Sequence, residues 1–340
     1  MTDYTLGLSA SWEIDIWKKL RNAKKVAFMK YLSSIEGKHF LVTKLVSEIA
    51  RMYYELLSLD NQLEILNQNI DIQQKARVIM VLQKKAAKVT ELAVKRFEAE
   101  IAKNKSHLFY IRQAITETEN RINFLVGRYP QHIKRDSKAF LNMVPQTIHT
   151  GIPSQLLENR PDIRQATLDL SVAKLNIKIA KAHFYPSFGI RANVGYQAFR
   201  PEFLLSSPES IIYSITGDII APLVNRNAIK TLYYNASSKQ VQAVYNYEQT
   251  LLKSYVEVAN LLSKVSNLEK SYTLKMKQVN ALTKSIDIST RLFRAARADY
   301  MEVLLTQRDA LDSKIELIET KRKQMEAVVN IYNALGGGWR

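Results

Sequence analysis

Two long stretches without glycine or proline constrain this chain more than any other feature. One runs from Gly37 to Gly127 and the other from Pro222 to Gly336. Both are rich in Ala, Leu, Lys, Glu and Gln, which favour helix, whereas glycine and proline interrupt it. The sequence therefore predicts very long helices. A helix over about 18–87 or 226–296 would be roughly 105 Å long at about 1.5 Å per residue, more than a single globular domain requires.

The first of these stretches carries an apolar seam typical of a coiled coil. Apolar residues step by three and four over residues 42–70, and such a seam needs a partner helix. The seam lapses over residues 73–77 and resumes over 94–125, with polar Asn104 and Thr118 in register. We interpret the second run as the returning arm of a helical hairpin.

Three short segments alternate instead with a period of two. They lie near the start of the chain, after residue 186 and after residue 210, and each has one apolar and one polar face. Membrane-spanning β-barrels use strands of about ten residues with this pattern. A soluble half-buried sheet shows the same alternation. Three lone strands beside long coiled coils cannot form a sandwich core, however, so we favour membrane strands.

A single offset aligns the second half of the chain with the first. It carries Gly127 onto Gly336 and Thr90 onto Asp299 without a gap, which indicates duplication. Each half reads as strand, long helix, turn and long helix. The second half also has a helix and a strand in front, whose counterparts would precede Met1. We therefore expect the native N-terminus to lie outside this sequence.

The repeat predicts a division into a first repeat over 1–130 that lacks its front helix and strand, a linker over 131–153 and a second repeat over 154–340. In the first repeat we expect a strand at about 4–16, a hairpin at about 18–126 and its tip at about 86–92. In the second we expect a helix at about 154–184, strands at about 187–199 and 211–222, a hairpin at about 226–335 and its tip at about 295–301.

Thr90 and Asp299 occupy the same repeat position, directly after the two expected hairpin turns. Both are preferred N-cap residues, and Glu302 completes a capping-box-like pattern with Asp299. The two residues could therefore serve only to start helices. A role at a functional tip carries about equal weight.

Composition and charge exclude most other kinds of function. The chain has no cysteine, so disulfides, thiolate metal sites and cysteine nucleophiles are absent, and its five histidines show no metal-ligand spacing. We therefore predict no enzyme activity, no catalytic residue, no metal and no cofactor. The charge of +17 leaves one alternative, a basic cytoplasmic coiled-coil protein on nucleic acid or an anionic surface. That alternative leaves the strands and the repeat unexplained, so we expect no nucleic-acid partner.

Several short motifs, in this order and spacing, resemble those of the TolC-like outer-membrane efflux factors that serve resistance-nodulation-division pumps. They are Ser11–Ile16, Thr118–Gly127, Gly151–Ile163, Ala182–Ser187 and Tyr332–Trp339. The resemblance implies a mainly α fold with a small membrane β part. It also implies a homotrimer whose protomers each give four strands to a twelve-strand barrel and paired helices to a tunnel across the periplasm.

The resemblance further implies a passive export channel of the outer membrane that extends into the periplasm. Its expected partners are a periplasmic adaptor protein, an inner-membrane pump of that class and outer-membrane lipid. Adaptor contact is expected at the two tips, at Ala87, Lys88, Val89, Thr90, Glu91, Ala296, Arg297, Ala298, Asp299 and Tyr300. Among these, Glu91 and Asp299 are candidates for an electrostatic gate. The residues expected to face the barrel lumen are Arg191, Asn193, Ser214, Thr216 and Asp218.

The chain departs from the family at both tips. The family usually has glycine just before the basic tip residue, whereas this chain has Ala87 and Ala296. If that position requires a positive φ, each alanine costs about 1 kcal/mol. The sequence therefore predicts altered tip geometry or altered adaptor docking.

Overall fold

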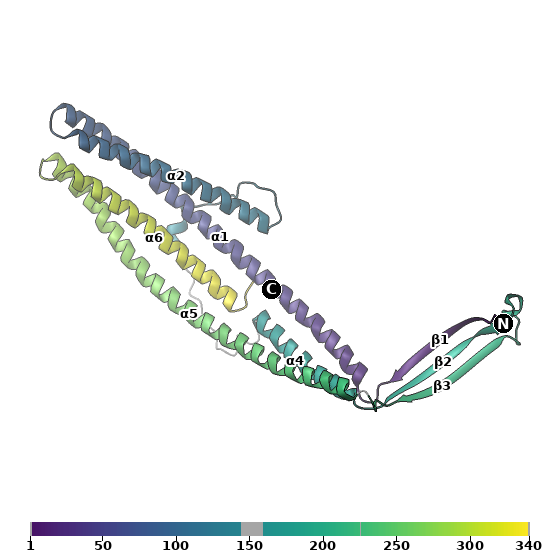
Figure 1. Cartoon of the computed structure of the whole chain (residues 1–340). Coiled ribbons are helices and arrows are strands. Elements are labelled where there is room, and N and C mark those ends of the chain that lie inside the picture. Colours follow the sequence, from purple (N-terminus) through teal and green to yellow (C-terminus); the bar gives the residue numbers. More distant parts are fainter. Residues whose placement is uncertain (1, 144–158, 225, 339–340) are drawn as a thin grey trace. The chain divides into compact units, whose positions relative to one another are not determined.

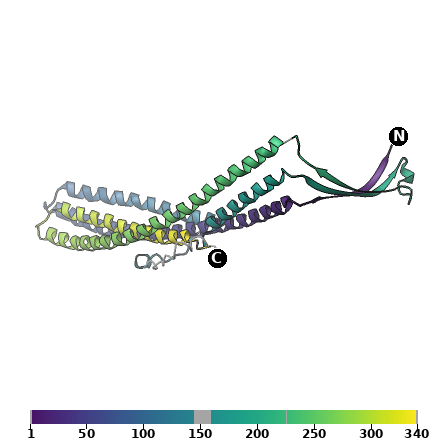
Figure 2. The same ribbon diagram turned by 90° about the horizontal axis from the view of Figure 1, so that it is seen from below.

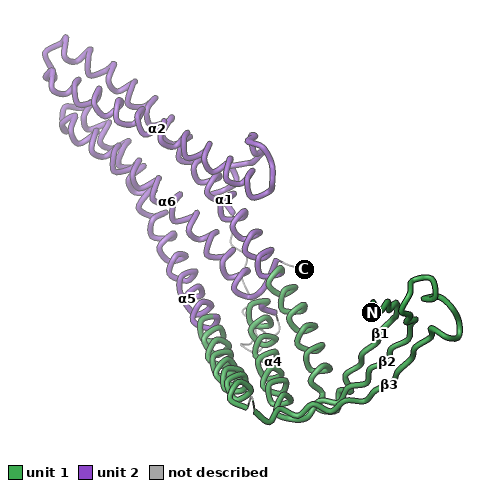
Figure 3. The backbone as a smooth tube through the Cα atoms, turned by 45° about the vertical axis from the view of Figure 1, so that its right-hand side comes forward, with its two compact units in different colours: residues 1–38, 161–253 green, residues 39–160, 254–340 purple. Residues whose placement is uncertain are grey.

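The computed structural model describes residues 2–143, 159–224 and 226–338, and it divides into two compact units (Figure 1, Figure 3). Unit 1 comprises residues 1–38 and 161–253, and unit 2 comprises residues 39–160 and 254–340. Each unit takes residues from both sequence repeats. The linker residues 144–153, the expected helix start at 154–158 and Trp339 lie outside the described residues.

Unit 1 contains a three-stranded antiparallel sheet in the order β1-β2-β3 (Figure 1). The strands are β1 at Tyr4–Ile14, β2 at Ser187–Ala198 and β3 at Ile211–Ile220. The register places Leu8 opposite Val194, and Val194 opposite Tyr213. All three of these side chains are exposed. Because side chains alternate along each strand, this pairing gathers the apolar residues on one face of the sheet.

Helix α4, at Pro161–Ala182, packs in unit 1 against the first part of α1, which spans Lys19–Lys85 (Figure 2). The Ser33 hydroxyl donates a hydrogen bond to Asp169 at 2.8 Å, and Arg164 pairs with Glu36 at 2.8 Å. Directly after α4, the Phe184 ring meets Tyr233 of α5 edge to face. Helix α5 spans Arg226–Arg294. These contacts link the first part of α1 to α4, and the first part of α5 to the residues directly after α4.

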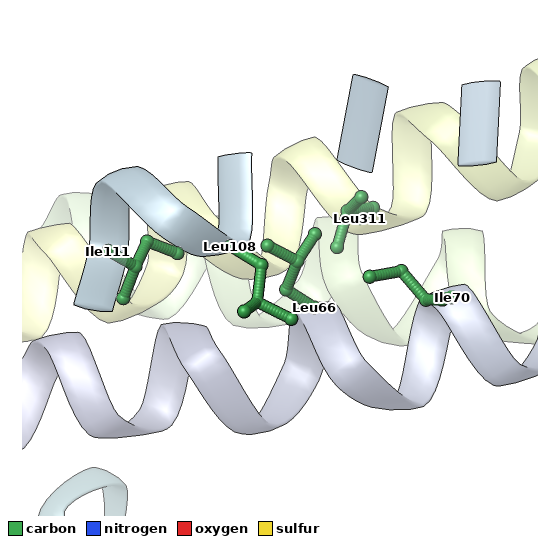
Figure 4. Close-up of a cluster of buried hydrophobic side chains, with 5 residues drawn as sticks. All are labelled: Leu66, Ile70, Leu108, Ile111 and Leu311. Atoms are coloured by element: carbon green, nitrogen blue, oxygen red, sulfur yellow. The ribbon is translucent and has the colours of Figure 1, made fainter. Parts of the chain in front are cut away.

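Unit 2 is built from two helical hairpins that lie side by side (Figure 1, Figure 2). One pairs α1 with α2, at Glu91–Leu125, and the other pairs α5 with α6, at Tyr300–Ala334. A buried apolar cluster joins them, with its side chains pointing toward one another (Figure 4). It takes residues from α1, α2 and α6: Leu66, Ile70, Leu108, Ile111 and Leu311. The predicted mainly helical fold with a small β part is confirmed.

The seam prediction was wrong at two places on α1. Near its upstream end the buried residues are Thr43 and Ser47, whereas Leu45 is 39% exposed. Both hydroxyls donate hydrogen bonds to the carbonyl four residues earlier, which removes the cost of burying them. Further along, Gln73 does not end the seam. It is fully buried and accepts a hydrogen bond from Asn104 at 2.9 Å, so the hairpin continues through a polar layer.

The described part of the inter-repeat segment is anchored along unit 2. Phe140, in the short 3-10 helix at Phe140–Asn142, is fully buried against Leu57 and Ile318. Arg135 donates to both oxygens of Asp60 at 2.6 and 2.9 Å. Burial alone would raise the pKa of Asp60, but the hydrogen bonds from Arg135 and Ser137 outweigh it and hold that pKa below its usual value. These contacts hold the segment against α1 and α6 of unit 2.

None of the helices in the described ranges combines the length and the apolar composition needed to cross a bilayer.

The returning helices α2 and α6 end in matching turns. Gly127 and Gly336 have φ of 71° and 80°, and both donate hydrogen bonds back into the preceding turn. Their surroundings differ, because a Cβ on Gly336 would lie 2.4 Å from the carbonyl oxygen of Asn159, whereas one on Gly127 would meet nothing within 4 Å. Next to Asn159, Arg160 donates to the Ala334 carbonyl at 2.8 Å and covers the end of α6.

This pair of glycines provides a matched test of the packing at the end of α6. We expect Gly127→Ala to cost about 1 kcal/mol, the price of a left-handed alanine alone. Gly336→Ala should cost about 2–4 kcal/mol, because the backbone of Asn159 must also move. Urea unfolding of the two purified variants checks this expectation. Equal costs would contradict the close contact between Gly336 and Asn159.

Candidate functional site

The first hairpin turns through a compact hydrogen-bonded cap after Lys85. The Ala87 N–H donates to the Lys84 carbonyl at 2.9 Å, and the Lys88 N–H donates to the Gln83 carbonyl at 2.9 Å. This pair of bonds is a Schellman motif, which satisfies the last carbonyls of a helix by placing one residue in the left-handed region. The residue in that position is Ala87.

The second hairpin repeats this turn bond for bond. The Ala296 N–H donates to the Phe293 carbonyl at 3.0 Å, and the Arg297 N–H donates to the Leu292 carbonyl at 2.9 Å. Ala87 and Ala296 both have a φ of 56°. The altered tip geometry expected from the sequence depends on a positive φ at this position, and φ is positive at both tips. Each tip therefore holds about 1 kcal/mol of backbone strain that glycine would not have.

Helices α2 and α6 begin directly after these turns. Thr90 and Asp299 occupy the N-cap positions with extended backbones, at ψ of 162° and 154°. Neither side chain makes a capping hydrogen bond, so the expected capping box of Asp299 with Glu302 is wrong. The Glu302 N–H bonds instead to the main-chain oxygen of Asp299 at 3.1 Å. The exposed Asp299 carboxylate is consequently not used in starting its helix.

The two tips lie at the same end of unit 2, where one apolar cluster holds them together (Figure 1). The cluster takes residues from α1, α2 and α6, and partly buried residues from α5 and α6 pack on it. Its members are Met80, Val94, Phe97 and Leu304, with Phe293 and Tyr300 against them. Phe97 is fully buried. Across the two hairpins, the Arg96 guanidinium also lies 3.1 Å from the Met301 sulfur. The tips therefore form one composite surface.

Cations predominate on this composite surface. The last helical turns of α1 and α5 carry two basic residues each, and each hairpin turn adds one more. The exposed cations are Lys84, Lys85, Lys88, Arg291, Arg294 and Arg297. Lys84 forms an ion pair with Glu91, the first acidic residue of α2. Slightly further from the tips, hydrogen bonds from Arg77 and Lys95 hold the pKa of Glu98 below its usual value.

The residues predicted to face a barrel lumen share one face of the sheet. Arg191 lies opposite Thr216 and Asn193 lies opposite Ser214 in the strand pairing. Asn193 donates to the Ser214 hydroxyl at 3.1 Å, and the Arg191 Nε lies 3.9 Å from an oxygen of Asp218. The pairing thus brings all of the predicted lumen residues into one polar patch.

Strand β1 adds residues to this patch that were not singled out from the sequence. Ser9 lies opposite Asn193, Ser11 opposite Arg191 and Glu13 opposite Gly189. The period-two alternation of β1 contained this information, because residues opposite each other in a sheet share a face. The sequence did not predict the register of β1 against β2, which the strand pairing in the structure supplies.

Residues 2–143, 159–224 and 226–338 contain no group of three His, Cys, Asp or Glu side chains placed to hold a metal ion.

Comparison with known proteins relates this chain to a family of outer-membrane efflux proteins. The family described as outer membrane efflux protein matches residues 1–128 and 152–337. The pyoverdine export outer membrane protein OpmQ of Pseudomonas putida is 26% identical over 339 residues, which cover 100% of this chain and 72% of that protein. The cation efflux system protein CusC of Escherichia coli is 24% identical over 338 residues, covering 99% and 73%.

Solved structures show the same fold. The outer membrane protein VceC of Vibrio cholerae gives a TM-score of 0.90 at 23% identity and covers 99% of this chain and 80% of its own. The open-state outer membrane channel MtrE of Neisseria gonorrhoeae gives a TM-score of 0.90 at 22% identity, covering 99% and 76%.

Amphipathic strands and paired long hairpins thus define an outer-membrane export channel of the TolC-like class. The chain belongs to the outer membrane efflux protein family. It is the channel component of a tripartite efflux system in the outer membrane and extends into the periplasm. Its relatives are efflux channels rather than enzymes, and the nucleic-acid alternative has no support.

The positive φ of the tip alanines leads to a direct test. Ala87→Gly and Ala296→Gly should each stabilise the tip by about 1 kcal/mol, because glycine removes the left-handed penalty. Hydrogen exchange of the Lys88 and Arg297 amides, whose bonds close the two caps, should slow about fivefold. The neighbouring changes Ala86→Gly and Ala295→Gly are matched controls that should not slow exchange. Faster exchange in Ala87→Gly or Ala296→Gly would contradict the strained cap.

Proposed function

We propose that the two hairpin tips together form the docking surface for the periplasmic adaptor, and that adaptor contact opens the tunnel. The surface comprises residues 87–91 and 296–300. The observation that carries this proposal is the identical cap at both tips combined with their shared apolar cluster. A partner therefore meets two copies of one turn, each with an exposed cation directly after the left-handed alanine, Lys88 in one and Arg297 in the other.

The working assembly in this proposal is a homotrimer of two-repeat protomers. Its protomers contribute strands to one barrel, with Arg191, Asn193, Ser214, Thr216 and Asp218 toward the lumen. The other face of the sheet is apolar and exposed, with Leu8 78% and Ile215 80% exposed. This apolar face supports a role in contact with lipid. The inner-membrane partner is a resistance-nodulation-division pump, which supplies the energy.

Transport through this channel is passive and involves no catalytic residue and no cofactor. The relatives are named for different cargoes, among them pyoverdine, cations, solvents and toluene. One fold that serves such different compounds supports a conduit that does not bind its cargo tightly. Selection of the exported compound then lies with the pump.

Glu91 and Asp299 are the proposed gate residues at the tip constriction. Their environments differ, because Glu91 is held by Lys84 whereas the Asp299 carboxylate makes no bond to its own helix. A fixed charge at a narrow point favours ions of the opposite sign. Of the two carboxylates, Asp299 accordingly has the larger effect on ion selectivity.

The docking proposal predicts that Lys88→Glu combined with Arg297→Glu abolishes most export. Reversing both charges repels a partner shaped for cations. In a strain that lacks its own copy of the channel gene, the variant should restore at most about one tenth of the efflux that the parent protein restores. Its trimer mass in detergent should be unchanged. Lys105→Glu with Lys277→Glu changes two exposed cations of the helices by the same amount and should restore efflux fully. Full efflux by the tip variant would refute docking at the tips.

The gate is tested by single-channel recording in planar bilayers. Asp299→Asn should shift the ion selectivity toward anions more than Glu91→Gln does, because Glu91 is already paired with Lys84. Unchanged conductance and ion selectivity in the double variant would eliminate the electrostatic gate while leaving adaptor docking intact.

A further inference from the structure

The junction between strand β1 and helix α1 carries a cluster of cations directly after the membrane strand. Its members are Lys18, Lys19, Arg21, Lys24 and Lys25. Lys19 pairs with Glu13, and Arg21 pairs with Asp15. Lys18, Lys24 and Lys25 are exposed, and no ion pair engages them within the described part of the chain. Positive charge therefore remains available at this point of the molecule.

An open groove of about 580 Å³ lies at the same junction. One part of its lining is apolar and continues the lipid-facing side of the sheet, through Trp12 and Ile14 to Leu20. Trp12 is 64% and Leu20 44% exposed. The charged part of the lining contains Arg21 and Lys24 together with Glu13 and Asp15. Both carboxylates are already paired, Glu13 with Lys19 and Asp15 with Arg21, so Lys24 is the cation of the lining that no described ion pair engages. A surface with an apolar floor and a cationic end matches a phospholipid, whose acyl chain and phosphate need these two environments.

The second repeat shows that the fold does not require these cations. The repeat offset places Tyr233 and Tyr234 of the β3–α5 junction at the positions of Lys24 and Lys25, and Asn227 at the position of Lys18. The β3–α5 junction has two basic residues, Lys230 and Arg226, and Arg226 occupies the position of Trp17. Both junctions connect a membrane strand to a long helix, so the basic cluster on one of them serves something other than folding.

The start of α1 does not itself provide the anion site. Two of its first amides are already engaged, because the Asp15 carboxylate accepts hydrogen bonds from the Leu20 N–H at 3.0 Å and the Arg21 N–H at 2.9 Å. Trp17 is also fixed, since its Nε1 donates to the Pro186 carbonyl at 2.8 Å and its ring stacks on Tyr185 at 4.5 Å. Tryptophan and tyrosine in this arrangement are typical of the membrane–water boundary. The cationic side chains thus sit at headgroup level.

We propose that this groove binds an anionic phospholipid on the periplasmic side of the outer membrane. The phosphate lies near Arg21 and Lys24, and the acyl chain lies along Trp12 and Leu20. This inference rests on the outer-membrane placement of the strands and is independent of adaptor docking at the tips. The bound lipid anchors the first strand-to-helix junction at the membrane surface. The second junction has Tyr233 and Tyr234 at the positions of Lys24 and Lys25.

Tryptophan quenching provides the test, because the chain has only three tryptophans and two of them, Trp12 and Trp17, lie at this junction. The third is removed by Trp339→Phe. The purified full-length protein is reconstituted in phosphatidylcholine vesicles that contain brominated phosphatidylglycerol or brominated phosphatidylcholine at the same fraction. Bromine quenches tryptophan only at contact range. We expect phosphatidylglycerol to compete for the site about tenfold better than phosphatidylcholine at low salt, and this preference to fall in 0.5 M sodium chloride.

Matched variants identify the groups responsible. Lys24→Gln with Lys25→Gln should remove the preference for phosphatidylglycerol, whereas Lys24→Arg with Lys25→Arg should keep it. Lys230→Gln, at the other junction, should leave it unchanged. Equal quenching by both lipids in the parent protein, or an unchanged preference in the glutamine variant, would overturn the proposal. Absence of quenching by either lipid would show that a neighbouring protomer fills the groove and would equally overturn it. Efflux by the same variants is read separately, so a failure of lipid binding is not confused with a failure of adaptor docking.

Discussion

The apolar packing between the two helical hairpins is the interaction on which the rest of unit 2 depends. A long amphipathic helix is marginal in water until its apolar face finds a partner. Met52 and Leu56 of α1 find theirs within the hairpin, against Ile122 of α2, and other parts of the seam are buried where the two hairpins meet. Leu66 and Leu108 from the first hairpin meet Leu311 from the second, and near the tips Phe97 meets Leu304 in the same way. Because these clusters join the hairpins, the two tips end at one place and can act as one surface.

The two hairpin tips are built from the same turn. A Schellman cap closes α1 and α5 with identical hydrogen bonds, and each cap forces an alanine into the left-handed region. Elsewhere in unit 2 the matching position is glycine, at Gly127 and Gly336, where the backbone relaxes without strain. Within the described part of unit 2, Ala87 and Ala296 are the only non-glycine residues with a positive φ; in unit 1, Lys18 has a φ of 60°.

The sequence predicted the helical hairpins and the turn positions well, because both depend on local signals. The stretches without glycine and proline indicate the long helices, and the apolar seam and the repeat point to the same turns. Asp299 was misjudged as a capping-box residue because propensity cannot tell whether its side chain or a solvent molecule satisfies the helix start. Gln73 was misjudged because its partner, Asn104, lies on the other arm. Phe140 and Arg135 gave no signal, since their partners are distant in the chain. The sheet register was equally beyond the sequence, although the alternation within each strand was clear.

Site-directed cross-linking tests whether the two hairpin tips form a single surface. The chain has no cysteine of its own, so engineered pairs give an unambiguous result. Arg96→Cys with Met301→Cys joins α2 to α6, and Lys84→Cys with Glu91→Cys joins the arms of one hairpin as a control. If the tips form one surface, a short bifunctional thiol reagent should link both pairs within one chain in the membrane-embedded protein. A link in the control pair without one between residues 96 and 301 would show that the tips are separate, and would contradict a composite docking surface.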